Sequence, residues 1–187
     1  MYRQPFPVRM LGTSLIEVLV AMVVLAIGLL GLVGLQARLQ VLQLESQQRA
    51  QGLILLHDMA NRLALNRNAA AGYVTEGALG AGEPCPTDTA TRQQADLSEW
   101  CAALAGAAET SDGNNVGAMV GGRGCIEGLG GDEYLVTVAW QGLAPLAAPP
   151  ESVSCGAGEY DGGDGAQCSD DRCRRVVTTV VRIADLS

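Results

Sequence analysis

The sequence predicts an α+β fold in which one long N-terminal helix packs on a small antiparallel β-sheet with a disulfide-stapled C-terminal region. Three observations predict it. An apolar run continues directly into an amphipathic helical pattern over residues 13–67. Two segments with the alternating, β-branched pattern of strands follow in the second half of the chain. The 187-residue chain also contains six cysteines, which favours an oxidising compartment.

The composition excludes several classes of function. Twenty acidic residues against 12 basic ones give a net charge of −8, which opposes binding to nucleic acids. The chain has no lysine, which excludes a lysine-containing phosphate-binding loop and a Schiff-base lysine. Its single histidine, His57, excludes His–His metal sites and most nucleophile–base pairs, and we interpret it as a surface or packing residue. We therefore expect neither an enzyme nor a cofactor.

The apolar run has the length of a membrane span. Residues 18–35 are 18 consecutive apolar positions, about 27 Å of helix, close to the thickness of a hydrocarbon core. Arg3 and Arg9 precede the run, so the positive-inside rule places the N-terminus in the cytoplasm. The span contains Gly28, Gly31 and Gly34. One interpretation is that they permit close helix packing or local unwinding during assembly. The other is the ordinary tolerance of membrane helices for glycine.

Beyond the span, the helical pattern continues without a cleavage site for an ordinary secretory signal. Apolar residues recur at spacings of three and four, with glutamines between them, up to a predicted end near residues 66–72. A helix this long exceeds what the core of a small domain needs, so its excess length is expected to meet lipid or other helices. The predicted apolar face consists of Leu35, Leu39, Leu42, Ala50, Leu53, Leu56, Ala60 and Leu63.

Residues 68–187 are predicted to form a small periplasmic domain. Residues 73–95 have the composition of a loop, and residues 96–104 have the pattern of a short helix capped by Asp96 or Ser98. Trp100 and Leu104 share one face of that helix and are expected to dock on the sheet.

Four strands are expected in this domain. Short ones are predicted at residues 116–120 and 125–126, around a turn at 121–124. The clearest strand covers residues 134–140, and a second, rich in β-branched residues, covers 176–183. A Pro- and Cys-containing insert at 145–173 separates these two.

The cysteines are predicted to form disulfides rather than a metal site. No CxxC pair occurs and only one histidine is available, which argues against a zinc site. Six cysteines allow 15 connectivities, of which we predict a Cys85–Cys101 bridge across the short helix. The remaining four, which would tie the insert to the sheet, are Cys125, Cys155, Cys168 and Cys173.

Acidic residues gather in the Gly-rich insert. Their side chains either hold Ca²⁺ or form a solvated loop, and the spacing matches no EF-hand, which favours the loop. These residues are Asp161, Asp164, Asp170 and Asp171.

The segment Gly12-Thr13-Ser14-Leu15-Ile16-Glu17-Val18-Leu19-Val20-Ala21 resembles the prepilin signal of type IV pilins and type II secretion pseudopilins. The resemblance implies a leader at residues 1–12, cleavage by a prepilin peptidase between Gly12 and Thr13, and N-methylation of Thr13. It also implies that Glu17 neutralises the new amine of an adjoining subunit during assembly. Without the resemblance, Glu17 is equally well a carboxylate that complements the helix dipole near the headgroups.

The order of long helix, connecting region, antiparallel sheet and Cys-rich C-terminal region is also similar to that family, and within it to minor pilins of the PilV type. This implies a subunit anchored in the inner membrane and then taken into a type IV pilus, with a role in starting assembly. The implied partners are prepilin peptidase, other minor and major pilins, and a tip adhesin as a further candidate. The alternatives are a minor pseudopilin of a type II secretion system and a membrane-anchored periplasmic protein that never polymerises.

Overall fold

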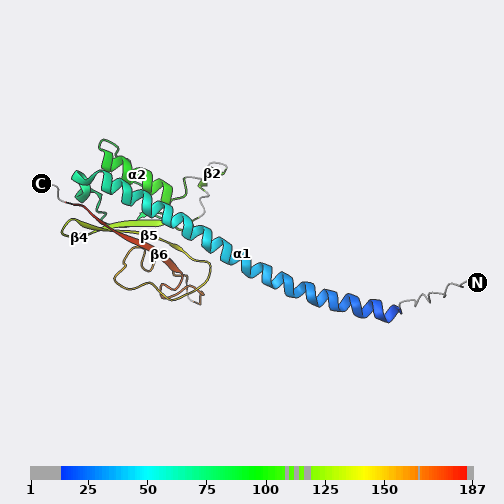
Figure 1. Ribbon diagram of the computed structural model, residues 1–187. Coiled ribbons are helices and arrows are strands. Elements are labelled where there is room, and N and C mark those ends of the chain that lie inside the picture. Colours follow the sequence, from blue (N-terminus) through cyan, green and yellow to red (C-terminus); the bar gives the residue numbers. More distant parts are fainter. Residues whose placement is uncertain (1–13, 108–109, 112–113, 116–118, 164, 185–187) are drawn as a thin grey trace, which may run out of the picture. The chain divides into compact units, whose positions relative to one another are not determined.

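The computed structural model describes residues 14–107, 110–111, 114–115, 119–163 and 165–184 (Figure 1). By its contacts the chain divides into two compact units, Met1–Leu42 and Gln43–Ser187, each described here by itself. The predicted leader at 1–12, the cleavage and methylation site at Thr13, positions 116–118 of a predicted strand and Asp164 lie outside the described residues.

A single α-helix, α1 (Leu15–Leu65), runs through both units and confirms the predicted long helix. It begins after Ser14, whose carbonyl accepts hydrogen bonds from the backbone N–H groups of Glu17 and Val18. It ends at Leu65, close to the predicted stop, and the short 3-10 helix η1 (Arg67–Tyr73) follows. Regular α-helix continues through Gly28, so no break accompanies the glycines of the apolar run.

The second unit contains a four-stranded antiparallel sheet in the order β1-β4-β5-β6. Its strands are β1 (Leu79–Gly80), β4 (Arg123–Gly130), β5 (Glu133–Gln141) and β6 (Arg174–Arg182). Strands β5 and β6 confirm the two clearest predicted strands. A separate pair, β2 (Thr110–Ser111) and β3 (Asn114–Asn115), lies between α2 (Arg92–Leu104) and β4.

One face of the sheet carries the hydrophobic core. The part of α1 after Leu42 and the whole of α2 pack on this face, as Figure 1 shows for the cyan and green helices. Trp140 of β5 lies against α1, and Trp100 of α2 lies over β4 and donates its indole N–H to the Leu55 carbonyl at 3.0 Å. The predicted docking of Trp100 and Leu104 on the sheet is therefore confirmed.

The buried side of α1 differs from the predicted apolar face. Ala50 and Leu53 are exposed, whereas Gln48 and Gly52 are buried. The reason lies at Gly52, where a Cβ would stand 2.9 Å from Cζ3 of Trp140, so only glycine leaves room for the indole. The side that contacts the sheet is accordingly Gln48, Gly52, Leu56, Met59 and Leu63.

Helix α2 begins four residues earlier than predicted, and its predicted caps were wrong. Thr91 is the N-cap, because its side chain accepts a hydrogen bond from the Gln94 backbone while the Gln94 side chain accepts one from the Thr91 backbone. This reciprocal arrangement is a capping box, and it satisfies two N–H groups that the first turn leaves free. Asp96 lies inside the helix and is buried.

Strand β4 replaces the predicted turn and short strand. The turn comes earlier, since Met119 and Val120 lie in it rather than in a strand, and Gly121 takes a φ of +62°. Arg123 and Gly124, predicted as turn, pair with β5. Gly124 fits here because Trp100 and Leu104 lie directly above its Cα.

Three disulfides staple this unit. Cys85–Cys101 joins the loop before α2 to that helix, as predicted. Cys125–Cys155 ties the insert to β4, also as expected of the remaining cysteines. Cys168–Cys173 instead closes a short loop within the insert just before β6, across a separation of only five residues.

Candidate functional site

The N-terminal part of α1 presents an exposed apolar surface. The helix is long and apolar enough to cross a bilayer, and none of its most apolar 18-residue window is buried. Every residue from Ser14 to Leu44 is exposed. Transfer of one such side chain out of water is worth about 1.5–3 kcal/mol, so this surface requires an apolar surrounding.

Glu17 lies in the first turn of α1, where the chain turns from Ser14 into the helix. Its carboxylate is exposed, and an acidic group at this position complements the positive end of the helix dipole. Three glycines lie further along the same surface, and a Cβ on any of them would meet nothing within 4 Å. Among the described residues, none therefore restricts the side chain at Gly28, Gly31 or Gly34.

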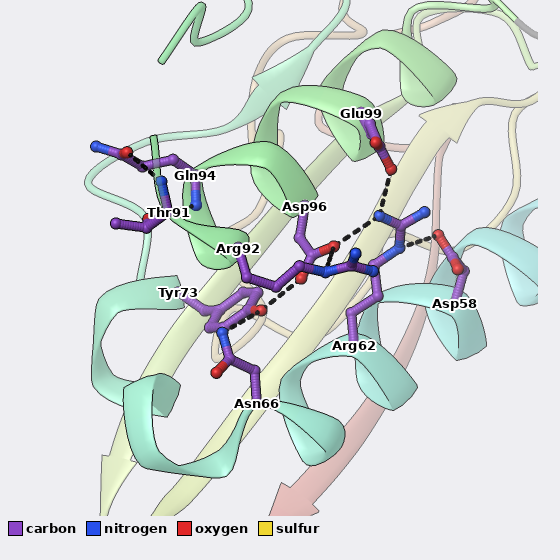
Figure 2. Close-up of polar contacts among 9 residues, drawn as sticks. All are labelled: Asp58, Arg62, Asn66, Tyr73, Thr91, Arg92, Gln94, Asp96 and Glu99. Atoms are coloured by element: carbon purple, nitrogen blue, oxygen red, sulfur yellow. Dashed lines mark hydrogen bonds and ion pairs between the residues drawn. The ribbon is translucent and has the colours of Figure 1, made fainter. Parts of the chain in front are cut away.

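An ion-pair cluster joins the C-terminal part of α1 to α2 (Figure 2). Arg62 of α1 donates to Asp96 at 2.8 Å and to Glu99 at 2.6 Å, both on α2. It also pairs with Asp58 one turn earlier at 3.0 Å. Because one guanidinium serves three carboxylates, it fixes the register between the two helices.

Asp96 is the buried centre of this cluster. Its second oxygen accepts the hydroxyl of Tyr73 at 2.6 Å, and Arg92 approaches its first oxygen at 3.1 Å. Burial lowers the pKa of Arg62, but its hydrogen bonds to Glu99, Asp58 and Asp96 outweigh this and raise it above the usual value. Burial, and then the hydrogen bond to Asp96, also raises the pKa of Tyr73.

The insert packs on the other face of the sheet through a buried arginine. Arg174, at the start of β6, donates to the carbonyls of Val153 at 2.6 Å and Cys155 at 3.1 Å. Its charge is matched by Asp171 at 3.0 Å. The sequence interpretation missed this residue, although its place next to Cys173 was a usable signal.

A second arginine attaches the insert at β4. Arg123 pairs with Glu159 at 2.9 Å and lies over the ring of Tyr160, 5.1 Å from its centre. The Tyr160 hydroxyl donates to the Gly121 carbonyl at 2.8 Å, and burial raises its pKa. With Cys125–Cys155, these contacts make the insert an ordered part of the unit.

The acidic residues of the insert serve its backbone. Asp161 accepts a hydrogen bond from the N–H of Asp171, and Asp171 accepts one from the N–H of Gly158. In the part of the chain that the structure describes, no three His, Cys, Asp or Glu side chains are grouped to hold a metal. His57 lies exposed on α1, as interpreted from the sequence.

An open groove of about 590 Å³ lies beside β1. Leu79 and Leu97 contribute to its apolar lining, and Glu76 and Glu83 contribute carboxylates. The nearby Ser154 hydroxyl donates to Glu127 at 2.6 Å. This hydrogen bond joins the insert to β4.

The chain was compared with protein-family models, curated proteins and solved structures, and none of them matches it.

Proposed function

We propose that this protein is a minor pilin of the PilV type, which takes part in the assembly of a type IV pilus as a filament or tip-complex subunit. In this proposal residues 1–12 are removed by prepilin peptidase and Thr13 becomes the methylated N-terminus. Before assembly α1 spans the inner membrane, with its N-terminus in the cytoplasm and the second unit in the periplasm.

The contrast between the two parts of α1 is the observation that carries the proposal. Within one unbroken helix, the part from Ser14 to Leu44 is exposed, whereas Leu56, Met59 and Leu63 are buried in the core of the second unit. A helix that serves only as an anchor needs lipid around its apolar part. A helix that also assembles needs an exposed apolar surface, and the described residues of α1 from Ser14 to Leu44 provide one.

Glu17 adds a chemical reason for ordered assembly. In a bundle of apolar helices an unpaired ammonium or carboxylate costs several kcal/mol, whereas a matched pair restores much of that cost. In the proposed filament, the Glu17 carboxylate pairs with the Thr13 amine of an adjoining subunit. The pair sets the axial position of each incoming helix as well as stabilising it.

The test is incorporation of Glu17→Ala into filaments. The variant is expected to insert in the membrane as the wild type does, but to be at least tenfold depleted in sheared pili, because the amine has lost its partner. Glu76→Ala is the matched control, since it removes an exposed carboxylate of the second unit. Equal incorporation of Glu17→Ala and Glu76→Ala would refute the assigned role of Glu17.

The alternatives make different predictions for the same cells. A pseudopilin predicts that deletion stops type II secretion and leaves pili intact. A membrane-anchored protein that never polymerises predicts that neither process responds to deletion.

A further inference from the structure

The loop that Cys168–Cys173 closes has a strained backbone. The two cysteines are five residues apart in the sequence, and residues 168–173 are called the disulfide loop here. In its middle, Asp170 and Asp171 take φ angles of +55° and +58°. Glycine adopts this left-handed region freely, whereas other residues enter it singly rather than in succession. Two consecutive left-handed aspartates therefore persist because their surroundings hold them there.

The disulfide loop also organises the insert. Its carbonyls accept backbone N–H groups from three separate segments, each at 2.8 Å. These hydrogen bonds run from Gly142 to Cys173, from Leu146 to Arg172 and from Gly162 to Cys168. A change in the backbone of the loop therefore alters the contacts of all three segments.

Asp171 connects the loop to the buried arginine of β6. Its carboxylate accepts the N–H of Gly158 at 2.8 Å and pairs with the Arg174 guanidinium at 3.0 Å. The Arg174 side chain is only 2% exposed, and Asp171 is its one ion-pair partner among the described residues. A buried charge that loses its partner is strongly destabilising. When Asp171 moves, Arg174 is therefore expected to move as well and to leave the carbonyls of Val153 and Cys155.

The Cys168–Cys173 bridge is accessible from one side. Cys173 is fully buried, whereas Cys168 is half-buried and lines an open pocket of about 270 Å³ beside Tyr160. Both members of the Cys125–Cys155 bridge are buried. A thiol from solution can therefore reach Cys168, while the bridge that ties the insert to β4 is protected.

The Cys85–Cys101 bridge provides a comparison within the same unit. Cys85 is half-buried, as Cys168 is, and Cys101 is fully buried. Residues 86–100, all of which the structure describes, contain no residue with a positive φ. Opening this bridge would release no left-handed residue, so the strain distinguishes Cys168–Cys173 from it.

We propose that Cys168–Cys173 is a redox-sensitive switch, which a dithiol opens by attack on Cys168 and which then frees the disulfide loop from Gly158, Gly162 and Arg174. The rest of the insert stays attached to β4 through Cys125–Cys155. The inference depends on the second unit alone, whether or not the chain joins a filament.

The reaction is a thiol–disulfide exchange in two steps. A thiolate of the reductant forms a mixed disulfide with Cys168, and Cys173 leaves as a thiolate. The second thiolate of the reductant then attacks the reductant's own sulfur in the mixed disulfide, and Cys168 leaves. The reductant becomes a disulfide and loses two electrons, and the protons of its two thiols pass to the two cysteines. Asp170 and Asp171 can then relax to negative φ, which withdraws the Asp171 carboxylate from Arg174.

The first test is reduction of the native full chain in detergent by millimolar dithiothreitol. Free thiols are alkylated and located by mass spectrometry of peptides. Cys168 and Cys173 are expected to be alkylated together, whereas Cys125 and Cys155 remain joined. Survival of Cys168–Cys173 until the sheet itself unfolds would overturn the proposal.

The second test is hydrogen exchange of the oxidised and reduced protein. It follows three amides that donate hydrogen bonds in and around the disulfide loop, namely those of Gly158, Gly162 and Asp171. Reduction is expected to make their exchange at least tenfold faster and to leave β5 unchanged. Equal exchange in both states would contradict the switch. Faster exchange of β5 would make the bridge a support of the whole unit and would contradict it too.

Two double variants separate the bridge from the reductant. Cys168→Ser with Cys173→Ser is expected to exchange as the reduced wild type does, without any dithiothreitol. Cys85→Ser with Cys101→Ser is the matched control, because it removes a bridge that holds no left-handed residue. It is expected to leave the Gly158 amide as slow as in the oxidised wild type. Equal effects of the two double variants would refute the role of the strained loop.

A third variant tests the connection through Arg174 with the bridge intact. Asp171→Asn retains an oxygen for Gly158 and a side chain that tolerates the left-handed region, but removes the charge that matches Arg174. Exchange at Gly158 and Gly162 is expected to become at least tenfold faster in the oxidised protein. Exchange as slow as in the wild type would show that Arg174 does not hold the loop in place.

Discussion

The two parts of α1 differ in the exposure of their apolar side chains. After Leu42 the helix presents a mixed side, with a glutamine, a glycine and large apolar residues, and this side fits the sheet and α2 closely. Over residues 18–35 the helix is apolar all round, and every residue of this stretch is exposed. The comparison teaches that hydrophobicity alone does not indicate where a helix finds its partners. The less apolar part is the one that packs within the chain.

The largest effect is expected from a matched pair of leucines on this one helix. Leu63 is 0% exposed and Leu30 is 72% exposed. Leu63→Ala leaves a cavity in the core and is expected to lower the free energy of unfolding by about 2–5 kcal/mol. Leu30→Ala should leave it unchanged. Urea unfolding of the full chain in detergent, followed by the fluorescence of Trp100 and Trp140, measures this, and equal effects would remove the distinction between the two parts.

The next effect concerns the cluster that joins α1 to α2. Asp96→Ala leaves the Tyr73 hydroxyl and one bond of Arg62 without an acceptor, so we expect a loss of about 1–3 kcal/mol. Glu99→Ala is the control, because Glu99 is 64% exposed and exposed pairs contribute about 0–1 kcal/mol. The same urea experiment compares the two. A Glu99→Ala loss as large as that of Asp96→Ala would mean that burial of Asp96 is unimportant.

A smaller effect, again from a matched pair, is expected at the glycines of α1. Gly52→Ala forces a methyl group against Trp140, at a cost of about 1–3 kcal/mol, which a gain of about 1 kcal/mol in helix propensity partly offsets. Gly31→Ala meets no neighbour among the residues that the structure describes and should leave the urea midpoint unchanged. An increase in stability from Gly52→Ala would show that Trp140 moves aside freely.

The smallest effect is a loss of stability at alkaline pH. The folded protein raises the pKa of Tyr73 above its usual 10.0, so folding favours the protonated phenol. This contribution is complete below pH 10 and is lost as the pH rises through the pKa of the folded state. Tyr73→Phe is therefore expected to flatten the decline in the urea midpoint above pH 10. An unchanged slope in that variant would assign the decline to other groups, of which Tyr160 is the first candidate.

Much of this fold could be predicted because its strongest signals are local. Three of these signals depend only on residues near one another in the sequence. They are the apolar run, the β-branched pattern of β5 and β6, and the Cys85–Cys101 bridge across a short segment. The capping box at Thr91 was equally local, and the sequence interpretation overlooked its Thr-x-x-Gln pattern.

The remaining features depend on partners distant in the sequence. Gly52 is buried because Trp140 occupies the space beside it, and Arg174 is buried because carbonyls of the insert surround it. Strand β4 contains three glycines, so its strand propensity is poor, and its pairing with β5 and the cover by Trp100 decide its structure. None of these follows from periodicity.

The proposed function requires that α1 is processed at its N-terminus and then joins a filament. The most direct measurement is the intact mass and N-terminal sequence of the protein from membranes, with and without active prepilin peptidase. We expect a peptidase-dependent product that begins at Thr13 and carries one additional methyl group. The same uncut form beginning at Met1 in both samples would contradict it and leave α1 as a membrane anchor only.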